Sequence, residues 1–185
     1  MRKIFLSAGH TNIKGKDRGA SGNGYIEGEL AVELRDLIVK ELKLLGVSPT
    51  IDSNDNALVH TMAFFKNLVS SNSILVDIHW NAATPQATGT ETLIPKTYTT
   101  FEYNLAAELS KVIGDTLGLK LRGYNGVKTE AESHHGSLGW MRLTGENILL
   151  EICFITNASD MEKYQKNKLS LAKQLALTLK KHLEK

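Results

Sequence analysis

Residues 149–155 read Leu-Leu-Glu-Ile-Cys-Phe-Ile, a short and nearly continuous apolar run with one carboxylate, Glu151, in its middle. Turn-forming residues bound the run, with Gly145 a few positions before it and Asn157 shortly after it. An apolar run of this length, rich in branched side chains, is typical of a strand that is buried on both faces of a sheet. The sequence therefore predicts that the fold is organised around a strand at this position.

The carboxylate of Glu151 needs a physical explanation in such a strand. An ionised Glu loses several kcal/mol of solvation on burial unless a cation or hydrogen-bond donors compensate. The simpler explanation is a side chain that reaches water at the strand end or pairs with an Arg. The alternative is a carboxylate aimed at a metal ion or a reacting group.

Strands and helices alternate along the rest of the chain. We expect strands at residues 3–8, 47–51, 74–79, 89–94, 138–142 and 148–155. We expect helices at 29–45, from Asp55 or Asn56 as the cap to 71, at 101–117, and as one or two helices over 159–185. This alternation predicts an α/β fold with a mostly parallel sheet and helices on both faces. The last two strands, joined by a tight turn, are expected to form an antiparallel hairpin or an irregularity at the sheet edge.

Length and composition favour one compact domain over residues 1–185. The net charge of +2 is too small to indicate a nucleic-acid partner, and no apolar stretch is long enough to cross a bilayer. The single cysteine excludes an internal disulfide and a Cys-based zinc ribbon. Residues 1–6 resemble the start of a signal peptide, but the apolar run stops early and fits a first strand better. We therefore expect synthesis in the cytoplasm with no encoded export route.

Two histidines follow the buried strands. His10 comes directly after the first strand, and His79 ends the strand at 74–79. If these strands are parallel neighbours, both imidazoles reach the same sheet edge, where ligands of α/β proteins bind. The glycine-rich loop 11–28 fits neither phosphate-binding motif but supplies Glu27, which completes a His-His-Glu zinc site with one open position. Each histidine taken alone is more simply a satisfied residue at a strand end.

A metal at this edge gives Glu151 a function. A carboxylate within hydrogen-bond reach of a zinc-bound water can take its proton and pass it to a leaving amine. Burial raises the pKa of such a carboxyl and Zn²⁺ lowers it, so it can work near neutral pH.

Five motifs occur in order along the chain. They are Ala8-Gly9-His10, residues 19–27, Asp77-Ile78-His79-Trp80-Asn81-Ala82, residues 138–142 and residues 150–157. Each is weak alone, but together they closely resemble the zinc-dependent N-acetylmuramoyl-L-alanine amidases of type 3, found among bacterial cell-wall hydrolases and phage endolysins. The resemblance extends from residue 3 to about 180.

The resemblance implies a twisted six-stranded sheet flanked by helices, with one Zn²⁺ bound by His10, Glu27 and His79 and with Glu151 as the catalytic acid and base. It implies hydrolysis of the amide between N-acetylmuramic acid and L-alanine of the peptidoglycan stem peptide. Self-inhibited members carry an added helix before the catalytic Glu. Ordinary elements fill residues 84–142 here, so we predict an open site. We also expect a monomeric phage-type lysin that reaches the wall by holin-type or other non-classical release.

Several residues have alternative interpretations. The family usually has Ser where Asp77 stands, and Asp77 either supports an imidazole or is a surface acid. Candidate substrate-binding residues are Arg142, His134 and Asn81. Arg142 could instead form a structural ion pair, and His134 could simply be exposed. Cys153 is more simply a packing residue than a nucleophile. Trp80 and Trp140 either line the cleft or pack in the core.

Two rival functions are compatible with the same residues. A zinc peptidase could cut a peptide bond elsewhere in the stem. A wall-binding module could retain the scaffold without activity, although the presence of all three candidate ligands and of Glu151 argues against it.

Overall fold

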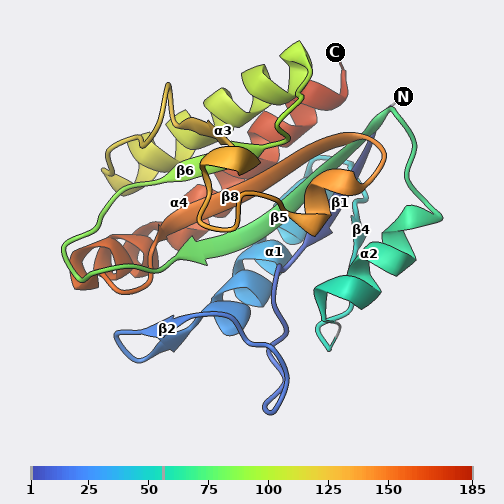
Figure 1. Ribbon diagram of the computed structural model, residues 1–185. Coiled ribbons are helices and arrows are strands. Elements are labelled where there is room, and N and C mark those ends of the chain that lie inside the picture. Colours follow the sequence, from blue (N-terminus) through green and yellow to red (C-terminus); the bar gives the residue numbers. More distant parts are fainter. Residues whose placement is uncertain (1, 56, 185) are drawn as a thin grey trace.

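The computed structural model describes residues 2–55 and 57–184. The fold is built on a central six-stranded sheet (Figure 1). Its strands, in spatial order, are β4 (Thr50–Ile51), β1 (Lys3–Ser7), β5 (Ser73–Asn81), β8 (Glu146–Phe154), β6 (Glu91–Ile94) and β7 (Val127–Thr129). The first four run parallel, β6 is antiparallel to β8, and β7 is parallel to β6. The expected α/β fold with a mostly parallel sheet is confirmed.

Strand β8 contains the apolar run at 149–155 except for its last residue, Ile155. It lies between β5 and β6 in the sheet, and all but one of its residues are buried. Its side chains alternate between two cores. Ile148 and Leu150 join the larger core, whereas Leu149 joins a smaller one on the opposite face. Glu151 shares the face of Leu149.

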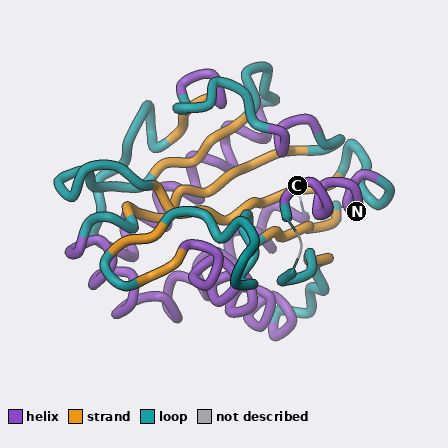
Figure 2. Tube along the Cα trace, turned by 60° about the horizontal axis from the view of Figure 1, so that its bottom comes forward, coloured by secondary structure: helices purple, strands orange, loops and turns teal. Residues whose placement is uncertain are grey.

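Helices cover the two faces unequally. The long helices α1 (Glu27–Leu44), α3 (Thr100–Leu117) and α4 (Ala158–Leu183) pack on the larger core and lie behind the sheet in Figure 1. The other face is covered by α2 (Leu58–Lys66) and the 3-10 helix η2 (Gly139–Arg142). Figure 2 shows the strands side by side as one twisted layer. The lightly covered face leaves room for a site.

Local chemistry fixes both ends of α3. Thr99 and Glu102 form a reciprocal capping box at the start of α3, and Gly118 ends that helix with a φ of 63°.

The expected cap of α2 was wrong. Its first residue is Leu58, Ala57 precedes it without a side-chain cap, and Asp55 lies further upstream. Asn56, the alternative cap, lies outside the described residues.

The structure corrects two further expectations. The strand expected at residues 138–142 is the 3-10 helix η2, so β8 is a central strand and has no hairpin partner there. Within η2, Trp140 turns inward and its indole N–H donates to the carbonyl of Ile148 at 3.1 Å. The sixth strand is β7, and the loop 11–28 contains the short hairpin β2 (Ser21–Gly22) and β3 (Tyr25–Ile26).

Over the residues that the structure describes, no helix combines the length and the apolar character that a membrane crossing needs.

Candidate active site

The two histidines meet at the carboxyl end of the sheet. Strands β1 and β5 are parallel neighbours, with Ser7 in register with Asp77. The chain leaves β1 and reaches His10 three residues later, while His79 lies near the carboxyl end of β5. Their ring centroids are 4.9 Å apart in an edge-to-face arrangement. The inference that parallel strands bring both imidazoles to one edge is confirmed.

Glu27 is the first residue of α1 and reaches the same place. Its carboxylate is buried, with 4% of the residue exposed. Oε1 accepts a hydrogen bond from the Trp80 N–H at 3.0 Å, and Oε2 accepts one from the Ala20 N–H at 2.8 Å. Two backbone donors therefore fix the carboxylate. Burial raises the pKa of Glu27, but the hydrogen bond and charge of His79, with help from His10, leave the pKa below its usual value.

The three side chains converge closely enough to share one ion. One donor atom from each of His10, Glu27 and His79 lies within 4.8 Å of the other two. Over residues 2–55 and 57–184 this is the one group of three such side chains that could hold a metal. Two imidazole nitrogens and one carboxylate oxygen form the donor set that Zn²⁺ takes in catalytic sites, so the residues fit this ion.

Two glycines make this convergence possible. A Cβ on Gly9 would stand 2.4 Å from Nε2 of His79, and a Cβ on Gly19 would stand 2.5 Å from Oε2 of Glu27. Both residues also have positive φ, at 60° and 70°. A larger residue at either position would displace a donor of the group.

Asp77, two residues before His79 on β5, supports the imidazole of His79. Its side chain is completely buried, and Oδ2 lies 3.1 Å from Nε2 of His79. The other imidazole nitrogen, Nδ1, lies 2.9 Å from Oε1 of Glu27. Burial lowers the pKa of His79, but the carboxylates of Asp77 and Glu27 outweigh burial and raise the pKa well above its ordinary value. The alternative of a surface acid at position 77 is wrong, and the carboxylate contacts the imidazole at its Nε2 edge.

Glu151 lies beside this group in the sheet. It is in register with His79 across the β5–β8 pair and with Glu91 across the β8–β6 pair. Side chains directly opposite each other share a face of the sheet, so these three residues form a row. Oε2 of Glu151 is buried and has no hydrogen-bond partner among the described residues. Burial raises the pKa of Glu151 to about 8, against the opposing effect of His79. A carboxyl group with this pKa can both accept and release a proton near neutral pH.

A cluster of charged residues, not anticipated from the sequence, continues the row. Glu91 is 7% exposed, and its Oε2 accepts hydrogen bonds from Nε of Arg122 at 2.8 Å and from Nζ of Lys128 at 2.6 Å. Asn81 donates to Oε1 of Glu91 at 2.9 Å. Burial raises the pKa of Glu91, but Lys128 and Arg122 outweigh burial and leave the pKa lowered. We call Glu91, Arg122 and Lys128 the cation cluster.

The candidate substrate-binding residues have different surroundings. Asn81 is part of the contacts of Glu91, one strand from Glu151. Arg142 donates from Nη1 and Nη2 to the two oxygens of Glu130 at 2.8 and 3.1 Å, which favours the structural ion pair. His134 is exposed, and its ring contacts that of His135. Substrate binding by these residues stays a prediction.

The remaining side chains singled out in the sequence pack in the interior. Cys153 is fully buried, its Sγ lies 3.9 Å from Sδ of Met161, and burial raises the pKa of its thiol. Such a thiol is not a nucleophile. Trp80 and Trp140 are 2% and 1% exposed, so they pack in the core and do not line a cleft.

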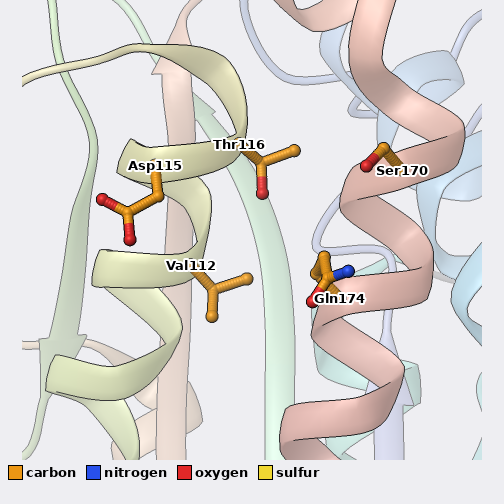
Figure 3. A pocket seen from close by; sticks show the side chains of 5 residues that line it. All are labelled: Val112, Asp115, Thr116, Ser170 and Gln174. Carbon is orange, nitrogen blue, oxygen red and sulfur yellow. The ribbon is translucent and has the colours of Figure 1, made fainter.

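A separate hollow lies between α3 and α4 (Figure 3). It is lined by Val112, Asp115, Thr116, Ser170 and Gln174. These helices cover the face of the sheet opposite Glu151, and one carboxylate is the only ionisable group in this lining. The hollow therefore takes no part in the site described above.

Comparison with known proteins identifies the group to which the chain belongs. The family model for N-acetylmuramoyl-L-alanine amidases matches residues 4–181. The uncharacterized protein YqiI of Bacillus subtilis (strain 168) is 29% identical over 164 residues, which are 88% of this chain and 74% of YqiI. The N-acetylmuramoyl-L-alanine amidase LytC of the same organism is 28% identical over 163 residues, which are 86% of this chain but 31% of LytC.

A solved structure agrees with these matches. A protein of Neisseria meningitidis, assigned as an N-acetylmuramoyl-L-alanine amidase, superposes with a TM-score of 0.80 at 25% identity. The superposition covers 98% of this chain and 96% of that one. The chain therefore belongs to the N-acetylmuramoyl-L-alanine amidase family of peptidoglycan hydrolases.

Proposed function

We propose that this amidase works with one Zn²⁺ held by His10, Glu27 and His79, and with Glu151 as the proton carrier. The observation that supports the proposal most directly is the register of Glu151 with His79, which puts an unpaired carboxyl group beside the three donor side chains. When bound, the zinc ion supplies a Lewis acid that polarises the scissile carbonyl and activates water.

Side chains of the protein carry out the remaining steps. Glu151 accepts a proton from the attacking water and then delivers it to the nitrogen of L-alanine as the amide breaks. The pKa of about 8 suits the second step, because the protonated carboxyl is abundant at neutral pH. The charge of the metal lowers that pKa, which favours the first step. The hydrogen bonds from the Ala20 and Trp80 N–H groups hold the Glu27 carboxylate in position to bind the metal.

Digestion of purified peptidoglycan tests this function. We expect the enzyme to release peptides that begin with L-alanine, detected by mass spectrometry, and to create no new reducing ends in the glycan. A chelator should abolish release, and added Zn²⁺ should restore it. A cut within the stem peptide would support the peptidase instead, and binding to the wall without any release would support the inactive module.

We also propose that Asp77 strengthens zinc binding through His79. An ionised Asp that accepts the Nε2–H of His79 would, in the zinc-loaded protein, fix the tautomer that leaves Nδ1, the nitrogen on the Glu27 side, free to bind the ion. Replacement Asp77→Asn removes the charge at nearly constant shape, and we expect zinc to bind about 10–100-fold more weakly. The measurement is competition with a chromophoric chelator. Asp115→Asn is the matched control, because Asp115 is exposed on α3 and should leave zinc affinity unchanged. Equal zinc affinity in Asp77→Asn and in the unmodified enzyme would rule out this role.

A further inference from the structure

We propose that Arg122 and Lys128 of the cation cluster bind a carboxylate of the stem peptide, on the side of the cleaved amide that carries L-alanine. This inference rests on the proposed function, because proton delivery by Glu151 fixes where the peptide lies. In the proposed function, neither metal binding nor proton transfer involves Arg122 or Lys128, and this inference gives the two residues a role in binding the substrate.

The charges of the cluster leave an excess of one positive charge. Glu91 contributes one negative charge, and Arg122 and Lys128 contribute two positive charges. Glu132 also lies near Lys128, but its carboxylate is exposed and accepts hydrogen bonds from the N–H and the hydroxyl of Thr129, at 2.8 and 2.9 Å, so water screens its charge. A partly buried site with an excess positive charge attracts an anion.

Contacts with neighbouring segments hold the two cationic side chains in place. The N–H of Arg122 donates to the carbonyl of Thr90 at 2.9 Å, which ties this segment to the start of β6. The guanidinium carbon of Arg122 lies 4.8 Å from the centre of the Phe154 ring. Lys128 belongs to β7, in register with Leu93 of β6. A pre-organised pair of cations loses little entropy when it binds a ligand.

Both cations keep donors available for a ligand. The side chains of Arg122 and Lys128 are 32% and 20% exposed. Arg122 uses Nε for Glu91, and neither terminal nitrogen has a hydrogen-bond partner among the described residues. The ammonium of Lys128 has three donors, of which Glu91 takes one. Arg142 differs, because Glu130 and Ser137 already occupy both of its terminal nitrogens.

The order of the row sets the position of the ligand. The metal-binding group, Glu151 and Glu91 follow one another across β5, β8 and β6 on one face of the sheet. If Glu151 delivers its proton to the nitrogen of L-alanine, the peptide attached to that nitrogen continues away from the metal. The next positions in this direction are those of the cation cluster. A carboxylate on the residue that follows L-alanine is therefore the expected ligand.

Binding of two matched substrates tests the proposal. They are synthetic muramyl peptides of equal length, one with a free carboxylate and one with a carboxamide on the residue after L-alanine. Measured by calorimetry on zinc-loaded Glu151→Gln protein, we expect the carboxylate form to bind about tenfold more tightly. Arg122→Gln and Lys128→Gln, each in the same background, should bring the ratio of the two affinities close to one. Lys120→Gln is the control, because Lys120 is exposed two residues from Arg122 and should leave the ratio unchanged.

The ratio does not depend on the fraction of folded protein, because both substrates are measured on the same sample. Equal affinity for the two substrates in the starting protein would overturn the proposal. A preference that persists in both Arg122→Gln and Lys128→Gln would overturn it as well. Failure of the proposed function would look different, because Glu151→Gln protein would then consume the substrates during the measurement.

Discussion

Replacing Glu151 with Gln lowers the turnover of peptidoglycan on the order of 10³-fold, the usual effect of removing a general acid and base. Gln keeps the shape and hydrogen-bonding capacity of the side chain but cannot accept or release a proton. The metal-binding group is built by His10, Glu27 and His79, so the zinc content of the variant should equal that of the unmodified enzyme. The measurements are the rate of release of L-alanine amino termini and metal analysis of the same preparation.

The control for this variant is Glu162→Gln. It makes the same chemical change at an exposed position of α4 and should retain full activity. Full activity in Glu151→Gln would show that another group carries the proton. Loss of zinc together with activity would show that Glu151 belongs to the metal-binding group.

The same variant has a second expected result in metal-free protein. Burial raises the pKa of Glu151 to about 8, above its value of 4.5 as an ordinary Glu. The folded state therefore holds the proton more tightly, and this contribution to stability is complete below 4.5 and lost as the pH rises to about 8. The raised pKa of His79 acts in the same direction at higher pH. Thermal unfolding in chelator at about pH 5 and pH 8.5 should show a smaller loss of stability in Glu151→Gln than in the unmodified chain. An identical pH dependence of both proteins would contradict the buried, protonated carboxyl.

The strongest sequence predictions came from the buried strands. The run at 149–155 and the run ending at His79 are continuous, and they became neighbours β8 and β5. The placement of His10 and His79 could then be predicted, because residues at the carboxyl ends of parallel strands lie at the same edge of the sheet. Local sequence pattern failed at residues 138–142, where a short segment expected as a strand contains the 3-10 helix η2. It missed β7 because three residues among glycines give too little pattern to read.

The cation cluster could not be found from sequence for a different reason. Glu91, Arg122 and Lys128 come from β6, a connecting segment and β7, and each resembles an ordinary surface charge when considered alone. Their contact depends on the antiparallel placement of β6 against β8, which the sequence did not indicate. The same holds for Arg35 on α1, which is buried although nothing in its sequence position indicates it.

Replacing Asp52 with Ala lowers the free energy of unfolding by about 3–5 kcal/mol, because it removes the buried carboxylate that pairs with the buried guanidinium of Arg35 and leaves that guanidinium with the exposed Asp36 as its counterion. Arg35 on α1 is 1% exposed, and its Nη1 donates to Oδ1 of Asp52 at 2.7 Å. Burial raises the pKa of Asp52 even though Arg35 opposes the shift. Desolvation of the Asp52 carboxylate, together with the charge of Asp77, thus outweighs the attraction of Arg35, and a buried ion pair of this kind contributes little net stability. Removing one partner is harmful because the other charge stays in the interior.

This argument predicts opposite results for a single and a double replacement. Asp36→Ala is the matched single control, because Asp36 also binds Arg35 but is 52% exposed, and it should change stability by about 0–1 kcal/mol. Arg35→Met combined with Asp52→Leu removes both charges, and we expect the double variant to be more stable than Asp52→Ala in urea-induced unfolding. A double variant as unstable as Asp52→Ala would mean that the carboxylate matters for another reason. The candidate is its contact with the end of β1, where Oδ2 accepts from the N–H of Ala8 at 3.4 Å, two residues before His10. Zinc affinity separates the two explanations, since only the second predicts weaker binding in the double variant.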